Sequence, residues 1–198
     1  MTRTQIVQYF INKYNYNSYL EIGVLNTSYN FDKIKCALKV GVDPAIHSAF
    51  YTAPDTGHMQ TSDDYFKNLS ADVKFDIVFI DGLHTREQVN KDISNSLSHL
   101  TKNGTIVLHD CSPSVASDEA TPNRCGDVWK SIYDLRKTTN NLLIGVVDTD
   151  YGVGVVRRGS PVPLPVLNDS VLDYNFLVQN RKSALNLVSV GDFMKGIF

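Results

Sequence analysis

The chain has 198 residues and a formal net charge of -2, with 42% hydrophobic and 20% charged residues. We expect residues 1–198 to form a single domain with a full core, with a helix within residues 1–16 and a helical extension over residues 160–198. The small net charge excludes a global attraction to nucleic acid or anionic membranes. The sequence predicts no membrane span, and MTRTQIVQYFINKY is too polar for a signal-peptide core. Three cysteines without metal-site spacing suit reduced thiols, so we expect a cytoplasmic protein.

The first third of the chain predicts a helix followed by buried strands. Apolar residues at helical spacing indicate an amphipathic helix over residues 3–14. Strands are expected over residues 18–23 and about 38–42. A short third strand is expected near residues 58–60, inside a looser connection over residues 45–61. Hydroxyl and acidic residues at 61–64 then predict the start of a helix.

The stretch FDIVFIDGLHTREQVNKDISNSLSHLTKNGTIVLHDC, residues 75–111, has the pattern of strand, helix and strand. We expect its helix to include Leu100 and to break at Asn103-Gly104, and its second strand to cover residues 105–108. A right-handed crossover makes the two strands parallel, so their carboxyl ends open on one side. Four side chains are therefore expected around one crevice: Asp81, His84, His109 and Asp110.

The rest of the chain predicts one more helix and a strand pair. The polar residues 112–126 are interpreted as a mobile rim over the crevice, and Asp127 as the cap of the following helix. Strands over residues 142–147 and 152–156 flank a turn, and one or two short helices are expected over residues 170–198. The alternation of strands and helices predicts a doubly wound α/β sheet.

The ends of the first two strands suit a nucleoside. Gly23 directly follows a strand and lets a ligand approach the backbone, while Asp43 can accept two hydrogen bonds from a ribose diol. A strand-end Asp is also common as a simple turn residue. The glycine-rich loop that binds a diphosphate is missing after Gly23, so a nucleoside without phosphate fits better.

Seven blocks occur in a characteristic order: YLEIGV, KVGVDP, TSDDYF, FDIVFIDGLHTREQVNKDI, GTIVLHDCSP, GDVWKSIYDLR and VVDTDYGVGVVRR. Over roughly residues 18–158 they resemble class I S-adenosylmethionine-dependent methyltransferases, and more narrowly the bacterial group found among surface-polysaccharide and sugar-modification genes. The resemblance implies a Rossmann-like seven-stranded sheet of order 3-2-1-4-5-7-6, with strand 7 antiparallel and helices on both faces. The second glycine of the family's E-x-G-x-G turn is absent, and NTSYN is interpreted as a longer substitute loop.

The resemblance also implies contacts with S-adenosylmethionine. Glu21 and Gly23 would form the floor of the pocket on the methionine side, and Asp43 would hold the ribose hydroxyls. Ser62-Asp63 matches the position at the edge of the adenine. Asp81 would lie near the sulfonium and the amino group of the methionine moiety.

Methyl transfer to a hydroxyl requires a group that accepts its proton. His84 is the first candidate for this base, with helix capping as the alternative role, and Asp81 and Asp110 complete the predicted catalytic set. His109 is expected to face away and pack. Some sugar O-methyltransferases resembling this chain hold a divalent cation on acids at these two strand ends, and oxygen ligands would favour magnesium. Because Cys111 replaces the usual third ligand, no metal site is predicted.

We therefore interpret the chain as an O-methyltransferase that acts on a hydroxyl of a sugar, glycan or other small acceptor in polysaccharide biosynthesis. Two alternatives stay open: a non-catalytic cofactor-binding or scaffolding module, and a nicotinamide-dependent oxidoreductase, which the missing diphosphate loop disfavours. No nucleic-acid partner is expected. The sequence leaves the acceptor and the oligomeric state open, a homo-oligomer included.

Overall fold

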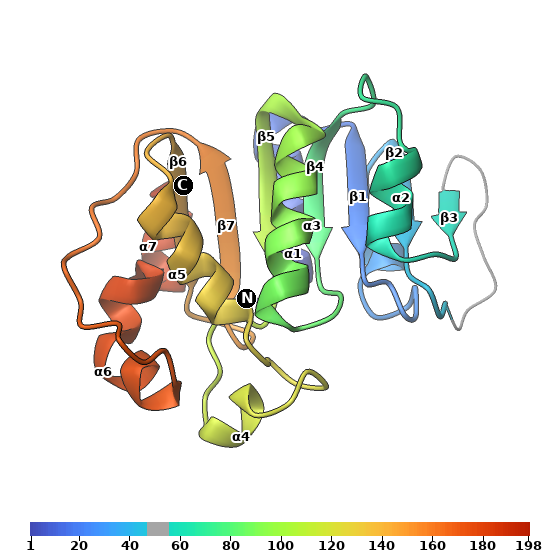
Figure 1. Ribbon diagram of the computed structural model, residues 1–198. Coiled ribbons are helices and arrows are strands. Elements are labelled where there is room, and N and C mark those ends of the chain that lie inside the picture. Colours follow the sequence, from blue (N-terminus) through green and yellow to red (C-terminus); the bar gives the residue numbers. More distant parts are fainter. Residues whose placement is uncertain (47–55) are drawn as a thin grey trace.

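The computed structural model describes residues 1–46 and 56–198. Within these residues, eight strands form one sheet in the order β3-β2-β1-β4-β5-β7-β6-β8 (Figure 1). The strands are β1 (Ser18–Ile22), β2 (Leu38–Val42), β3 (Thr56–His58), β4 (Phe75–Ile80), β5 (Leu100–Leu108), β6 (Leu142–Val147), β7 (Val153–Arg158) and β8 (Leu187–Val188). The helices are α1 (Arg3–Tyr14), η1 (Phe31–Lys33), α2 (Ser62–Asn68), α3 (Arg86–Ser98), α4 (Ala116–Glu119), α5 (Val128–Thr138), α6 (Tyr174–Leu185) and α7 (Val190–Met194).

The predicted strand order is confirmed, with one strand added. Strands β1 to β5 pair in parallel, and β7 is antiparallel to both β5 and β6. The expected count of seven is wrong because β8 pairs with the outer edge of β6. Asn186 ends α6 in the left-handed conformation and turns the chain back toward the sheet. A strand of two residues is too short to show a hydrophobic period, so it could not be recognised from the sequence pattern.

Two apolar layers cover the two faces of the sheet. Val78 and Ile80 of β4 face a layer that includes residues of α2, α3, α5 and α6. Ile77 and Phe79 face the opposite layer, built with α1, η1 and α7. Helices α2 and α3 lie in front of the sheet in Figure 1. A strand with both faces buried is apolar at successive positions, which explains the continuous run in β4.

The predicted boundary between α3 and β5 is wrong. Helix α3 ends at Ser98, and Leu100 already pairs with Phe75 of β4. Gly104 lies inside the strand beside a register shift, where a Cβ atom would come within 2.8 Å of the Asp76 carbonyl oxygen. The glycine therefore permits a close approach between strands at an irregularity of the ladder. In the sequence, a glycine at such a site has the same pattern as one that ends a helix.

The structure also tests the predicted starts of α2 and α5 and the loop between β5 and α5. The helix predicted at residue 61 is α2, and Thr61 caps it by accepting a hydrogen bond from the Asp64 N–H. Asp127 precedes α5 as predicted but makes no capping hydrogen bond with its side chain; its carboxylate pairs with Lys130. The loop predicted over residues 112–126 contains the short helix α4.

The third strand is β3, which begins two residues before the expected range. Part of the connection expected over residues 45–61 lies outside the described residues. In the described part of the chain, no helix has the length and apolarity to cross a membrane.

Candidate functional site

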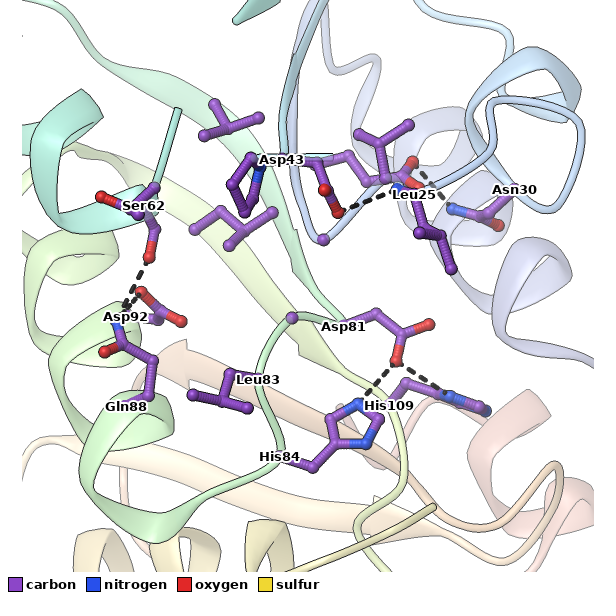
Figure 2. A pocket seen from close by; sticks show the side chains of 18 of the residues that line it. Leu25, Asn30, Asp43, Ser62, Asp81, Leu83, His84, Gln88, Asp92 and His109 are labelled. Carbon is purple, nitrogen blue, oxygen red and sulfur yellow. Dashed lines mark hydrogen bonds and ion pairs between the residues drawn. The ribbon is translucent and has the colours of Figure 1, made fainter. Parts of the chain in front are cut away.

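A cavity of about 610 Å³ opens where β1, β2, β4 and β5 end, and the first turns of α1, α2 and α3 contribute to its walls (Figure 2). This is the edge at which open α/β sheets bind ligands, and the volume suits a small molecule. The structure brings every predicted site residue to this cavity: Glu21, Gly23, Asp43, Ser62, Asp63, Asp81, His84 and Asp110. The walls also contain His109, which the crevice prediction included, and four residues that the sequence did not single out, namely Arg3, Asn30, Gln88 and Asp92.

The turn after β1 brings two strand ends together. Gly23 has φ +87°, and a Cβ atom there would lie 2.2 Å from the Asp81 carbonyl oxygen, so a side chain could not fit. Leu25 stands where the E-x-G-x-G pattern has its second glycine, and its φ of 47° is left-handed. The left-handed backbone conformation that glycine would adopt is thus kept at Leu25 itself.

Asp43 is held by the backbone around it. Its Oδ2 accepts from the Leu25 N–H at 2.9 Å, and its Oδ1 accepts from the Ala45 N–H at 2.7 Å. An ionised carboxylate has about four lone-pair positions, so acceptor capacity is left for a ligand. Asp43 is therefore oriented at the cavity wall and able to accept hydrogen bonds from a diol.

Glu21 lies on the cavity floor and is almost completely buried. It accepts hydrogen bonds from the Tyr19 hydroxyl and from Asn30 Nδ2 at 3.0 Å. Burial nevertheless raises its pKa to about 8. Asn30 in turn accepts from the Thr4 hydroxyl at 2.7 Å, which ties the first turn of α1 to the floor of the cavity.

The far end of the cavity, beside α2, contains a cluster that the sequence only partly predicted. Gln88 Nε2 lies 3.2 Å from Ser62 Oγ, 3.0 Å from Asp63 Oδ1 and 3.1 Å from Asp92 Oδ1. Asp92 is buried in this cluster, and burial raises its pKa to about 6. The signal that could have found it is its place next to Ile93, on the buried side of α3.

Asp81 joins two histidines at the centre of the cavity. Its Oδ1 lies 3.2 Å from His84 Nε2 and 3.2 Å from His109 Nδ1 (Figure 2). Burial alone would raise the pKa of Asp81, but the two imidazoles outweigh it and hold the pKa below its ordinary value. Asp81 is therefore ionised at neutral pH and presents negative charge beside both rings.

Both ring nitrogens of His84 have oxygen neighbours. Nδ1 bonds the Arg124 carbonyl oxygen, so it carries a proton, while Nε2 faces the Asp81 carboxylate. Burial lowers the pKa of His84, but Asp81 and Asp110 raise it further, and the net shift is upward. His84 can accept a proton only above this raised pKa.

The expectation that His109 packs on the opposite face is wrong. Strand β5 ends at Leu108, so the alternation of faces does not extend to His109, and the ring lies in the cavity. Its Nδ1 is 3.4 Å from Asp110 Oδ2, and its Nε2 is 3.5 Å from Asp150 Oδ1. Burial opposes protonation, but the surrounding carboxylates raise the pKa of His109 to about 11. Asp150, interpreted as a turn residue, is therefore also part of this charged group.

Asp81, His84 and Asp110 could hold a cation, because one donor atom from each lies within 4.8 Å of the others. Two carboxylates and an imidazole are donors that several divalent metals accept. Cys111 follows this group in the chain but is fully buried in the core, where its thiol lies near the His109 carbonyl oxygen.

Comparison with known proteins relates this cavity to methyltransferases. The family described as "Methyltransferase domain" matches residues 39–111. No curated protein sequence matches the chain. Among solved structures, PaMTH1 of Podospora anserina, bound to S-adenosylhomocysteine, is 12% identical with a TM-score of 0.59, covering 80% of this chain and 78% of its own.

Two further structures share the fold. The O-methyltransferase TomG of Streptomyces achromogenes, in complex with S-adenosylmethionine, is 10% identical with a TM-score of 0.57 and 80% of each chain covered. MycE, from mycinamycin biosynthesis, in complex with Mg, S-adenosylhomocysteine and mycinamycin VI, is 18% identical with a TM-score of 0.54, covering 79% of this chain and 49% of its own.

The strand order and the position of the cavity are those of the class I methyltransferase fold. The family match indicates a methyltransferase domain over residues 39–111, and the solved structures show that the chain shares the fold of these methyltransferases.

Proposed function

We propose that this chain transfers the methyl group of S-adenosylmethionine to a hydroxyl of a small acceptor, with a sugar or glycan as the preferred class. The observation that carries the proposal is the continuity of one cavity. Asp43, which can accept hydrogen bonds from a ribose diol, lies on one wall, and the Asp81–His84 pair lies on another. One molecule can thus be held by its ribose while its reactive end faces a group able to take a proton.

The charges of the cavity suit this cofactor. S-adenosylmethionine carries a sulfonium and an ammonium group next to each other, and both are stabilised by nearby carboxylates. Asp81 provides an ionised carboxylate beside Gly23, whereas Glu21 on the floor, with a pKa raised to about 8, provides a mostly neutral carboxyl group at pH 7. Ser62-Asp63 lies at the other end, where the adenine would be placed.

Methyl transfer is an in-line displacement: the acceptor oxygen attacks the methyl carbon, and the carbon–sulfur bond breaks to leave S-adenosylhomocysteine. The oxygen must lose its proton as the new bond forms. In our proposal, His84 accepts this proton at Nε2, and Asp81 stabilises the imidazolium that results. Asp110, whose Oδ2 lies 3.6 Å from His84 Nδ1, supports the same charge from the other side of the ring.

A sugar hydroxyl is the proposed acceptor because the cavity around β4 and β5 is rich in hydrogen-bonding side chains, namely Asp81, His84, His109 and Asp110. Such walls suit an acceptor with several hydroxyls better than an apolar ring. The motif resemblance to sugar-modifying methyltransferases supports the same class, and with it a place in polysaccharide biosynthesis in the cytoplasm.

Isothermal calorimetry with S-adenosylmethionine, S-adenosylhomocysteine and NAD⁺ tests the cofactor. We expect the first two to bind and Asp43→Ala to weaken both by about 1.5–3 kcal/mol, the usual loss for hydrogen bonds to a charged group. Asp72→Ala removes an exposed acid far from the cavity walls and serves as the control. Binding of NAD⁺ in place of the methyl donor would overturn the proposal, and unchanged affinity in Asp43→Ala would remove Asp43 from the site.

Transfer of a labelled methyl group to a panel of sugar nucleotides and small alcohols separates an enzyme from a cofactor-binding module. We expect the rate to survive treatment with a chelator, because Cys111 follows Asp110 where a further oxygen ligand would be needed. A rate that chelation abolishes and magnesium restores would instead make Asp81 and Asp110 metal ligands.

A further inference from the structure

The first residues of the chain are fixed against the candidate site. The Arg3 backbone N–H donates to Asp150 Oδ2 at 2.7 Å, and the Thr149 hydroxyl donates to the Met1 carbonyl oxygen. Both hydrogen bonds join segments that are far apart in the sequence, because Thr149 and Asp150 lie in the turn between β6 and β7. The start of α1 is therefore attached to the same edge of the sheet as the cavity.

The Arg3 side chain enters the cavity wall. Its Nη1 lies 3.3 Å from His109 Nε2 and 3.6 Å from Asp150 Oδ1. Its Nε lies 3.7 Å from Asp81 Oδ2, which is beyond hydrogen-bond distance, and this buried atom has no hydrogen-bond acceptor among the described residues. The guanidinium thus keeps donor capacity inside a wall where unpaired donors are costly.

Arg3 lies between the part of the cavity around β1 and the part around β4 and β5. On one side, the neighbouring Thr4 reaches Glu21 and the end of β1 through Asn30. On the other side, Arg3 itself lies beside Asp81 at the end of β4. The resemblance places the methionine part of a bound cofactor at Gly23 and Asp81, and that part would then lie next to Arg3.

The charged side chains of the cavity wall also favour a role for Arg3 in ligand binding. Among the described residues that line the cavity, Arg3 is the sole lysine or arginine, and the surrounding carboxylates keep His109 protonated as well. The acids are Asp43, Asp63, Asp81, Asp92 and Asp110, together with Glu21, whose raised pKa favours its neutral form. S-adenosylmethionine carries a carboxylate as well as two cations. The acids suit the sulfonium and the ammonium but repel the carboxylate, which needs a cationic donor. An arginine is well suited to this task because its planar N–H groups match a carboxylate.

We propose that Arg3 binds the α-carboxylate of the methionine moiety, so that the N-terminal segment completes the cofactor site. This inference rests on the proposed function, since it assigns a residue to the same cofactor. Arg3 is then a specificity residue: it distinguishes the complete methyl donor from molecules that share its nucleoside and sulfonium but lack the carboxylate.

The test compares two ligands on the full chain by calorimetry. Decarboxylated S-adenosylmethionine keeps the sulfonium and the amino group and lacks the carboxylate alone. We expect Arg3→Gln to weaken S-adenosylmethionine by about 10–100-fold, the effect of losing charge-assisted hydrogen bonds. The same change should alter affinity for the decarboxylated analogue by less than about threefold. Lys35→Gln removes an exposed positive charge elsewhere and should affect neither ligand.

Equal losses for the two ligands would overturn the inference, because Arg3 would then act only through the shape of the cavity. Unchanged affinity for both would overturn it as well. Arg3→Lys keeps the charge near Asp81 and Asp150 and provides a second variant if Arg3→Gln does not fold; it should show the same selective loss, reduced to a few-fold. If the wild-type chain binds neither ligand, the proposed function itself fails, whereas wild-type binding without selectivity contradicts Arg3 alone.

Discussion

The two halves of the cavity are built in different ways. Around β1 and β2, the key carboxylate Asp43 is held by the backbone N–H groups of Ala45, 2 residues away, and of Leu25, 18 residues away. Around β4 and β5, Arg3 meets His109 across 106 residues and Asp150 across 147 residues. The first half is thus assembled over much shorter separations in the chain than the second.

The halves also differ in how they treat carboxyl groups. Burial raises the pKa of Glu21 to about 8 and that of Asp92 to about 6. His109 and other donors lower the pKa of Asp150 to about 2, and two histidines lower that of Asp81. The same chemical group is thus kept protonated more easily in one half and ionised in the other. The ionised half is the one that faces the proposed reaction.

The largest expected effect concerns the half around β4. We predict that His84→Gln lowers the rate of methyl transfer by about 10²–10⁴-fold, the usual contribution of a general base. S-adenosylmethionine affinity should stay nearly unchanged, because the proposed cofactor contacts lie on other residues. His99→Gln, which changes a histidine on the far side of α3 from the candidate site, is the control. Normal turnover in His84→Gln would contradict the role and make Asp81 or Asp110 the next candidate.

The pH dependence of the wild type sharpens the same point. Asp81 and Asp110 raise the pKa of His84 above its ordinary value of 6.5, so the neutral ring that can accept a proton is present at higher pH. The rate should therefore rise with pH, with a midpoint above 6.5, and fall as the pH drops through that midpoint. A profile that is flat between pH 6 and 9 would exclude His84 as the base.

A smaller effect tests the half around β1 by protein stability. The pKa of Glu21 is higher in the folded state than in the unfolded state, so the folded chain binds the proton more strongly. The contribution of Glu21 to the stability of the wild type should therefore decrease as the pH rises from about 4.5 to about 8. Glu21→Gln removes this dependence, and we expect the variant to gain roughly 1–3 kcal/mol relative to wild type between pH 5 and pH 9.

Urea unfolding at several pH values measures this change, and Asp81→Asn provides the opposite case. The pKa of Asp81 is lower in the folded state than in the unfolded state. The ionised carboxylate therefore stabilises the fold at pH values above the pKa of the unfolded state, and this stabilisation is lost as the pH falls through the pKa of the folded state. Asp81→Asn should therefore destabilise the chain at pH 7. Identical pH dependence in wild type and Glu21→Gln would show that burial does not perturb Glu21 as described.

Local patterns predicted the doubly wound α/β sheet, the crevice and the residues at the strand ends, whereas the strand order came from the resemblance to methyltransferases. Gly23 and Asp43 were found because each directly follows a strand, where its chemistry depends on the adjacent backbone. His109 was misplaced because strand alternation was carried one residue past the end of β5. The role of Arg3 could not be predicted, since a lone arginine at the start of an amphipathic helix has the same pattern as an exposed residue.

The smallest expected effect concerns Leu25, whose backbone has the conformation that glycine adopts most easily. A left-handed leucine costs about 1–2 kcal/mol, and Leu25→Gly relieves this cost. The glycine also loses more conformational entropy on folding, which offsets roughly 0.5–1 kcal/mol of the gain. Leu25 is 44% exposed, so the apolar burial lost on truncation is only part of that of a core leucine and offsets the remaining gain. We therefore expect the stability of Leu25→Gly to lie within about 1 kcal/mol of wild type.

Its neighbour Val24 gives the matched control for thermal unfolding. Val24 is 2% exposed and is not left-handed, so Val24→Gly removes core packing and should cost about 2 kcal/mol or more. The Leu25 N–H remains available to Asp43 in Leu25→Gly, so cofactor affinity should change less than in Asp43→Ala. If Leu25→Gly destabilises the chain as much as Val24→Gly does, the Leu25 side chain is itself a packing element of this turn, and the absent glycine is compensated by its contacts with the cavity wall.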